Sequence, residues 1–286
     1  MWRSMRPYLG ILVLCSSLSA CFTIQLTEKD LLKPDARTGF QHQESLQLAD
    51  LQKIVPEVKL DRLQLSQVKD AQIQGIRLQA YDKAPTVLYF GGNLFHLDQS
   101  ASYLLRAAKQ CQVNLIIYDH RGSGRSSGSP NVENMRTDAL AIYDQSRQQV
   151  AGKLIVHGQS LGSFVAGYLA QQRPLDGLVL ETTGTTIQEL GDAMMPWYAS
   201  PFAKVEVEPA LQVINNPDSV RQFSSPALVL SGEKDQTTPA ALGQKVYQAL
   251  PPGNKRYYLS PGAGHNGILA RKDVQQEYCA FLNQFK

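Results

Sequence analysis

Short apolar segments alternate with longer amphipathic segments over most of the chain. Five segments are continuously apolar, which is typical of strands buried on both faces of a parallel sheet; they are 86–90, 114–118, 153–157, 178–181 and 227–231. Between and after them the pattern predicts helices at 98–110, 131–149, 161–172, 239–250 and 266–285, with a last strand at 257–260. Because strands alternate with helices, we predict an α/β fold with one doubly wound, mostly parallel sheet.

Two further features modify this plan. Residues 58–65 and 73–81 alternate apolar and polar side chains, which predicts two antiparallel strands ahead of the parallel ones. The connection at about 184–222 is too long for an ordinary loop and predicts a small cap insertion. Within it, the stretch Met194-Met195-Pro196-Trp197-Tyr198 is expected to pack mostly on its own domain, and contact with an acyl chain is the alternative.

The N-terminal segment is short, apolar and preceded by two arginines. The stretch Tyr8 to Ala20 has 13 residues, too few to cross a bilayer core of about 30 Å at 1.5 Å per residue. It ends in Leu18-Ser19-Ala20-Cys21, which resembles a lipobox, where a signal peptide is removed and the cysteine is lipidated. We expect residues 1–20 to be a lipoprotein signal peptide and Cys21 to be lipidated, with an ordinary secretory signal as the alternative.

The region that follows the cysteine is polar. Residues 21–50 show no clear period and predict a tether between the lipid and a domain that spans 51–286. Phe22 stands where a retention aspartate would sit, so the lipoprotein resemblance implies the outer membrane of a bacterial envelope, facing the periplasm. Stable anchoring takes more than one acyl chain, as such lipoproteins carry. The expected partner is therefore a membrane, reached through the N-terminal lipid.

The composition narrows the functional classes. The 286 residues include 28 Lys and Arg against 25 Asp and Glu, a net charge of +3. Such a balance, without a basic cluster, argues against nucleic acid as a partner. The sequence has no phosphate-binding loop, paired zinc-binding cysteines or H-E-x-x-H helix. We therefore predict neither a cofactor nor a metal.

The strongest chemical signal is the sequence Gly158-Gln159-Ser160-Leu161-Gly162. It has the form G-x-S-x-G and lies between a predicted strand and a predicted helix, the context of a nucleophile elbow. A glycine- and serine-rich turn that only caps the helix is the bland alternative. We predict that Ser160 is a catalytic nucleophile.

A serine nucleophile needs a base, and the base needs an acid that orients it. Of the five histidines, only His265 lies late in the chain, in a loop between the last strand and the last helix. Asp235 follows a buried strand and lies between Ser160 and His265 in the chain. Glu233 in the same loop is its nearest rival, and a helix-capping role for Asp235 is the structural alternative.

Two backbone N–H groups must stabilise the oxyanion that forms on the substrate. One is expected from Leu161, the residue after the nucleophile. The other is expected from the loop Phe90-Gly91-Gly92-Asn93-Leu94 after the first parallel strand. Asn93 is the predicted donor, with Gly92 as the alternative.

In their order, the motifs GGN, DxRGxGxS, HGxSxG, GxxDxxxP and GAGH over residues 58–286 resemble the α/β-hydrolase superfamily. The similarity is greatest to the α/β-hydrolase-domain proteins and the bacterial serine-aminopeptidase-like hydrolases. The resemblance implies the α/β-hydrolase fold, the triad Ser160, Asp235 and His265, and a structural role for the loop 119–126. Gly91 stands where many members have histidine.

These observations predict a lipid-anchored serine hydrolase that cleaves carboxylic esters, such as an acyl ester, a lysophospholipid or a thioester. The alternatives are a serine peptidase of the aminopeptidase-like kind and a non-catalytic envelope-binding lipoprotein.

Cys111 and Cys279 remain once the signal peptide is removed and Cys21 is lipidated. In the α/β-hydrolase fold their helices resemble a pair that packs side by side, and the expected compartment is oxidising. A disulfide between them is one hypothesis and two buried free thiols are the other, and the sequence leaves both open.

Overall fold

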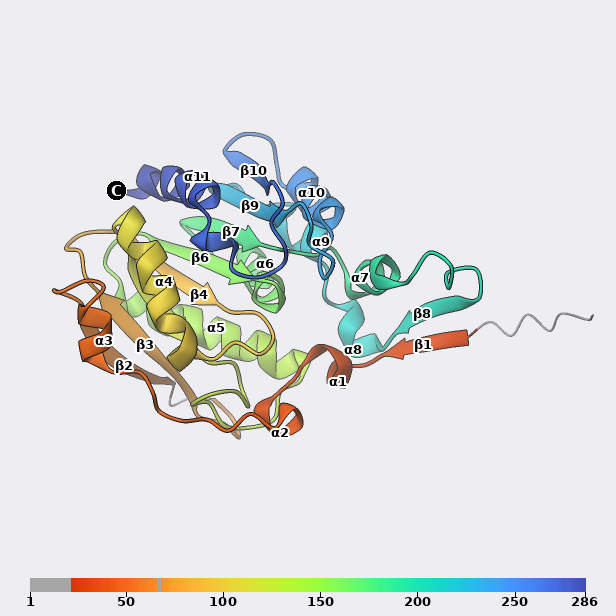
Figure 1. Ribbon diagram of the computed structural model, residues 1–286, viewed down its shortest axis with the longest axis horizontal. Coiled ribbons are helices and arrows are strands. Elements are labelled where there is room, and N and C mark those ends of the chain that lie inside the picture. Colours follow the sequence, from red (N-terminus) through yellow and green to blue (C-terminus); the bar gives the residue numbers. More distant parts are fainter. Residues whose placement is uncertain (1–21, 66–67) are drawn as a thin grey trace, which may run out of the picture.

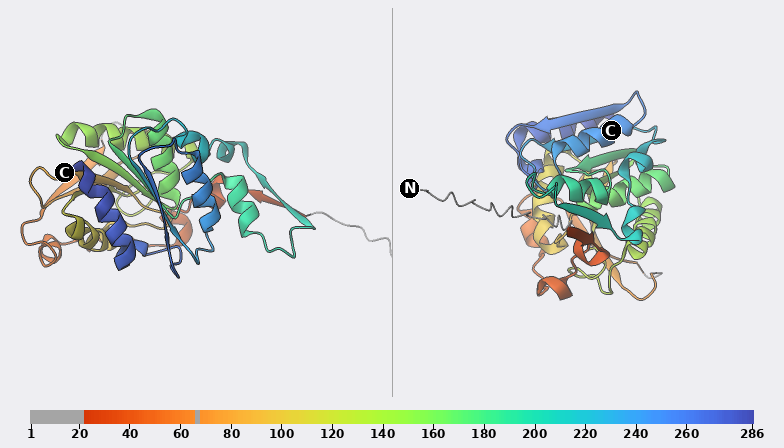
Figure 2. Two further views of the ribbon diagram at one scale, coloured as in Figure 1. Left: turned by 90° about the horizontal axis from the view of Figure 1, so that it is seen from above. Right: turned by 90° about the vertical axis from the view of Figure 1, so that its right-hand side faces the viewer.

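The computed structural model describes residues 22–65 and 68–286 (Figure 1). The predicted signal peptide and Cys21 lie outside the described residues. The body of the protein is a central sheet between two layers of helices (Figures 1 and 2). Among the described residues, no helix has the length and apolar character needed to cross a membrane.

The central sheet has eight strands in the order β10-β9-β7-β6-β4-β5-β3-β2. All neighbours pair in parallel except β3, which is antiparallel to both β2 and β5. In chain order the strands are β2 (Lys59–Leu65), β3 (Ile73–Gln79), β4 (Thr86–Phe90), β5 (Asn114–Tyr118), β6 (Leu154–Gln159), β7 (Gly177–Glu181), β9 (Ala227–Gly232) and β10 (Lys255–Ser260). The predicted doubly wound, mostly parallel sheet is confirmed.

Helices cover both faces of this sheet. The α-helices of the described residues are α1 (Glu28–Leu31), α2 (Asp35–Thr38), α3 (Leu48–Gln52), α4 (Leu97–Cys111), α5 (Val132–Gln149), α6 (Leu161–Gln172), α7 (Ile187–Met194), α8 (Pro209–Gln212), α9 (Asn216–Val220), α10 (Ala240–Ala249) and α11 (Lys272–Leu282). On one face α4 and α11 pack on the sheet, and on the other α5, α6 and α10 do so. Side chains of β4 alternate between these two cores, with Val87 and Tyr89 in one and Leu88 and Phe90 in the other. This explains why the strand is apolar at every position.

The last predicted helix is shorter than expected. Residues 266–285 contain a 3-10 turn at Ile268–Ala270, then α11, then a second 3-10 turn at Asn283–Phe285. Gly267 adopts a left-handed conformation with φ of 72°, which favours glycine and does not continue a helix. The residues just after His265 are therefore a loop.

Residues 22–50 do not form the predicted tether. Strand β1 (Phe22–Leu26) pairs in parallel with β8 (Ala203–Val207), and α1 to α3 follow it along the body. The carboxylate of Asp35 accepts hydrogen bonds from the His96 side chain at 2.7 Å and from the backbone N–H of Gly124 at 2.8 Å. The polar residues that suggested a solvated linker thus bind loops of the body. Their contacts are remote in sequence, so no local period marks them.

The insertion predicted at 184–222 has two parts. Residues 187–207, which hold α7 and β8, form with β1 a projection that we call the arm (Figure 1). Helix α9 instead packs beside α6 and α10, and its last residue, Val220, is part of the hydrophobic core. Against expectation, Met194, Trp197 and Tyr198 are 56%, 85% and 64% exposed. These side chains do not pack on their own domain.

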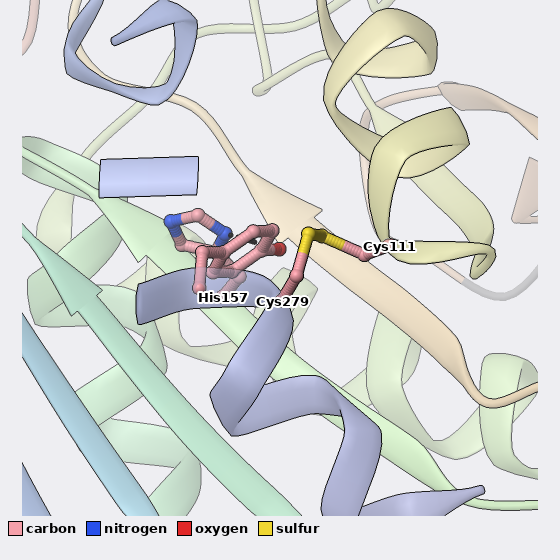
Figure 3. The surroundings of a disulfide bond; sticks show 4 residues. Cys111, His157 and Cys279 are labelled. Atoms are coloured by element: carbon pink, nitrogen blue, oxygen red, sulfur yellow. Dashed lines mark hydrogen bonds between the residues drawn. A yellow bond between two sulfur atoms is a disulfide. The ribbon is translucent and has the colours of Figure 1, made fainter. Parts of the chain in front are cut away.

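The two remaining cysteines form a disulfide. Cys111 ends α4, Cys279 lies in α11, and their Cα atoms are 4.7 Å apart. Figure 3 shows the bond beside His157, whose Nδ1 lies 3.0 Å from the Tyr278 hydroxyl. Of the two hypotheses that the sequence left open, the structure supports the disulfide and not the two free thiols.

Candidate active site

Ser160 lies in a tight turn between β6 and α6. Its backbone has φ of 52° and ψ of −116°, a conformation that is strained for a residue with a side chain. The two flanking glycines allow this turn. A Cβ on Gly158 would lie 2.1 Å from the carbonyl oxygen of Gly162, and one on Gly162 would lie 2.0 Å from that of Phe90. The turn therefore presents the serine hydroxyl beyond the carboxyl end of the sheet.

The structure brings Ser160, Asp235 and His265 together. His265 lies in the loop after β10, and its Nε2 is 2.9 Å from the Ser160 hydroxyl. Its Nδ1 is 2.9 Å from Oδ2 of Asp235, which follows β9. Both loops leave the carboxyl edge of the parallel sheet, which is why residues 105 and 30 positions apart in the chain meet. The three groups form one continuous hydrogen-bonded chain.

The environment of Asp235 favours its ionised form. Oδ1 accepts hydrogen bonds from the backbone N–H groups of Thr237 and Thr238, at 2.9 and 2.8 Å. The Thr238 hydroxyl lies 2.7 Å from Oδ2 and donates to it. Burial alone would raise the pKa of Asp235, but the hydrogen bonds from His265 and Thr238 outweigh it, and the pKa is lowered. A carboxylate at neutral pH is what stabilises a protonated imidazole.

The predicted oxyanion loop lies directly against the nucleophile. A Cβ on Gly92 would be 3.1 Å from Cβ of Ser160, so the backbone of this loop approaches the serine closely. The backbone N–H groups of Asn93 and Leu161 have no hydrogen-bond acceptor among the described residues. The side chain of Asn93 is engaged elsewhere, because its amide donates to the Leu31 carbonyl oxygen at 2.5 Å. Any contribution of Asn93 to an oxyanion hole therefore comes from its backbone.

His120 supports this loop, a role that sequence reasoning missed. Its Nε2 lies 2.7 Å from the carbonyl oxygen of Gly91. Burial lowers the pKa of His120, so the ring stays neutral and donates one N–H to that carbonyl. Fixing the Gly91 carbonyl orients the peptide groups that follow it. The motif DxRG places a histidine here without indicating what it binds.

The rival acidic residues are bound elsewhere. Oε2 of Glu233 accepts the backbone N–H of Gly262 at 2.7 Å. Asp119 is buried and accepts the backbone N–H groups of Leu97 and Arg125 at 2.7 and 2.9 Å. Burial raises the pKa of Asp119 to about 6. These bonds fix the start of α4 and the loop 119–126, which matches the structural role implied by the resemblance.

The other histidines also have protein partners. His157 is fully buried, with its Nε2 3.0 Å from Glu181, and is structural as expected. His96 pairs with Asp35 rather than lining the site. Among residues 22–65 and 68–286 there is no group of three or more side chains able to hold a metal ion.

A small cavity, with room for about one water molecule, lies beside Leu161. Its walls include the apolar Phe90 and Val165, the charged Arg121 and Asp138, and Leu32 from the N-terminal segment. The segment that was predicted to be a tether therefore forms part of the wall next to the oxyanion loop. Sequence patterns contain no signal for this contact.

Known proteins share both the sequence pattern and the fold. Residues 83–221 match the sequence model of a family described as serine aminopeptidase, S33. An uncharacterized protein of Mycobacterium tuberculosis is 30% identical over 185 residues, which cover 64% of this chain and 63% of that relative. The match thus spans less than two thirds of the relative's length.

Solved structures resemble the whole body of the protein. An esterase of Pyrococcus furiosus has a TM-score of 0.64 at 16% identity, with 86% of this chain and 99% of that chain covered. A structure described as a bacterial membrane phospholipase A has a TM-score of 0.60 at 18% identity, with 83% and 89% covered. At these identities the likeness concerns the fold.

A mostly parallel sheet with a serine in a tight strand-to-helix turn is the arrangement that defines the α/β-hydrolase fold. The chain therefore has the α/β-hydrolase fold, and residues 83–221 resemble the serine aminopeptidase family in sequence.

Proposed function

We propose that the protein is a membrane-anchored serine hydrolase that cleaves carboxylic esters through an acyl-enzyme. The observation that carries this proposal is the hydrogen-bonded chain from the Ser160 hydroxyl through His265 to Asp235, with 2.9 Å at each step. Such a chain activates a serine that is otherwise a weak nucleophile.

In the proposed reaction, the Ser160 oxygen attacks the ester carbonyl carbon while His265 Nε2 accepts the hydroxyl proton. The negative charge on the former carbonyl oxygen is held by the backbone N–H groups of Asn93 and Leu161. Asp235 stabilises the protonated imidazole. His265 then gives its proton to the leaving alkoxide, and the acyl group stays on Ser160. A water molecule, deprotonated by His265, releases the acid and restores the serine.

The acyl side of the substrate is proposed to be apolar. Neighbours described as an esterase and as a membrane phospholipase A support an acyl substrate of this kind.

A serine peptidase is the second candidate, favoured by the description of the matching family as serine aminopeptidase. Among the described residues, the insertion at 184–222 adds only α7, β8 and the short helices α8 and α9, without a propeller or a large cap domain to admit peptides selectively, and for this reason we place esters first. A profile over p-nitrophenyl esters of increasing chain length, with aminoacyl p-nitroanilides alongside, separates the two. Faster turnover of the anilides would replace our proposal with the second.

The test of the catalytic assignment is labelling by a fluorophosphonate probe together with ester turnover. Ser160→Ala should abolish labelling, and His265→Ala should lower kcat by about 10⁴-fold or more, with no further loss in the double variant. Ser102→Ala, on α4 away from the site, is the matched control. Near-normal turnover by His265→Ala would show that the base is wrongly assigned. A wild-type protein that takes up no probe would favour the non-catalytic alternative.

We also propose that the chain is held at the outer membrane of a bacterial envelope by lipid on Cys21. The Cys111–Cys279 disulfide supports an oxidising compartment. Cys21→Ser should move the protein from the membrane fraction to the soluble periplasmic fraction while turnover of soluble esters persists. Wild-type protein found only in the soluble fraction would refute the anchor.

A further inference from the structure

The arm carries an unusual share of the exposed apolar surface. Among residues 22–65 and 68–286, ten large hydrophobic side chains are exposed, and six of them lie on the arm. They are Phe22, Ile24, Met194, Trp197, Tyr198 and Phe202. Single exposed hydrophobic residues are common on any protein, but a contiguous group marks an interaction surface.

Four of these residues lie within the nine-residue stretch 194–202, and strand β1, which holds Phe22 and Ile24, pairs with β8 directly after it. The rings of Trp197 and Tyr198 contact edge to face, with centroids 6.0 Å apart. The backbone N–H of Phe22 donates to the carbonyl oxygen of Phe202 at 2.7 Å. We call residues 194–202 together with Phe22 and Ile24 the arm tip.

The arm tip is apolar and uncharged, and it is attached to a closely packed helix and sheet. From Ala193 to Ala203 no side chain carries a charge, and the stretch Phe22–Leu26 carries none either. Behind the tip, α7 packs closely on the two-stranded sheet, since a Cβ on Gly191 would lie 2.8 Å from Leu26 and 2.9 Å from Val205. The exposed aromatic residues therefore project from an ordered element.

The position of the chain start indicates what covers this surface. Strand β1 begins at the arm tip and runs toward the body, in parallel with β8 (Figure 1). The residue before Phe22 is Cys21, the proposed site of lipidation. Whatever holds that end of the chain at a membrane holds the arm tip there too.

We propose that the arm tip docks into the interfacial region of a lipid bilayer. Trp and Tyr are enriched at this depth, where an apolar ring and a polar edge are both satisfied. The inference rests on the proposed membrane location but not on the proposed reaction. The arm leaves the body at the carboxyl edge of the sheet, the edge that carries Ser160 (Figures 1 and 2). Docking thus turns the catalytic edge toward the lipid.

The test uses tryptophan fluorescence of the full chain on vesicles. The sequence has two tryptophans, Trp2 and Trp197, so Trp2→Phe leaves Trp197 as the sole reporter. On phosphatidylcholine vesicles with brominated acyl chains, its emission should fall at least twofold relative to unbrominated vesicles. High salt should not reverse this, because the tip is uncharged.

The matched reporter is Leu48→Trp in a Trp2→Phe/Trp197→Phe background. Leu48 is 40% exposed and begins α3, which lies on the side of the body away from the arm. Its emission should be unaffected by bromine. Unquenched Trp197 in protein that floats with the vesicles would overturn the proposal, and so would equal quenching of both reporters. Concentration-dependent dimers with blue-shifted Trp197 emission before vesicles are added would also overturn it, in favour of a second copy of the chain.

A second measurement links docking to turnover. For Trp197→Ser/Tyr198→Ser/Phe202→Ser, the rate on a long-chain ester in vesicles, divided by the rate on a soluble short-chain ester, should fall at least tenfold. Leu48→Ser should leave this ratio unchanged, and an unchanged ratio in the triple variant would contradict docking. If the wild type cleaves neither ester, the proposed function fails, whereas the quenching experiment still decides the docking.

Discussion

Removal of the Cys111–Cys279 disulfide should strongly destabilise the fold. The bond closes a loop with a sequence separation of 168. On the chain-entropy account, such a cross-link restricts the unfolded chain by about 5 kcal/mol at 25 °C. The double variant Cys111→Ala/Cys279→Ala should lower the free energy of unfolding by up to this amount. Both helices that the bond joins also pack on the sheet, so the native fold should persist.

The assay is urea unfolding followed by circular dichroism. With a slope of about 3 kcal/mol/M, the midpoint should fall by about 1.7 M in the double variant. Reductant should produce a similar fall in the wild type and none in the variant. An unchanged midpoint in the variant would refute the reasoning. So would two titratable thiols in wild-type protein that is denatured without reduction.

Two further predictions concern the site. Gly162→Ala should lower the free energy of unfolding by about 1–3 kcal/mol and reduce kcat, because its Cβ would lie 2.0 Å from the Phe90 carbonyl oxygen. Thermal unfolding and turnover measure the two effects, with Gly152→Ala as the control, since no atom lies nearer than 4.0 Å to a Cβ there. Equal effects of the two substitutions would contradict the steric argument. Thr238→Val removes a hydrogen bond that lowers the pKa of Asp235. Asp235 should then be protonated at higher pH, so that the acid limb of the kcat/KM profile moves upward in pH. Thr237→Val keeps the backbone N–H that Asp235 accepts, so it should leave the acid limb in place. Coincident profiles for the two variants would disprove the role of the Thr238 hydroxyl.

The strands of the central sheet and the candidate catalytic residues could be predicted from local patterns in the sequence. Strands β4 and β5 occupy the predicted ranges 86–90 and 114–118, because complete burial of a strand requires apolar residues at every position. Ser160 was identifiable because a tight strand-to-helix turn needs glycines at fixed spacing. His265 and Asp235 could be predicted as the base and the acid because they follow Ser160 in the order acid then base, each in a loop after a predicted strand.

The sequence alone left undecided which segments far apart in the chain contact each other. The disulfide remained open because the approach of α4 and α11 depends on how both pack on the sheet. The pairing of β1 with β8 was missed, since parallel strands far apart in the chain share no turn and no common period. For the same reason polar residues such as Asp35 were taken for a solvated tether, when in fact they bind loops of the body. Only the tertiary structure places Phe22 beside Phe202, because long-range packing, rather than local pattern, determines which segments become neighbours.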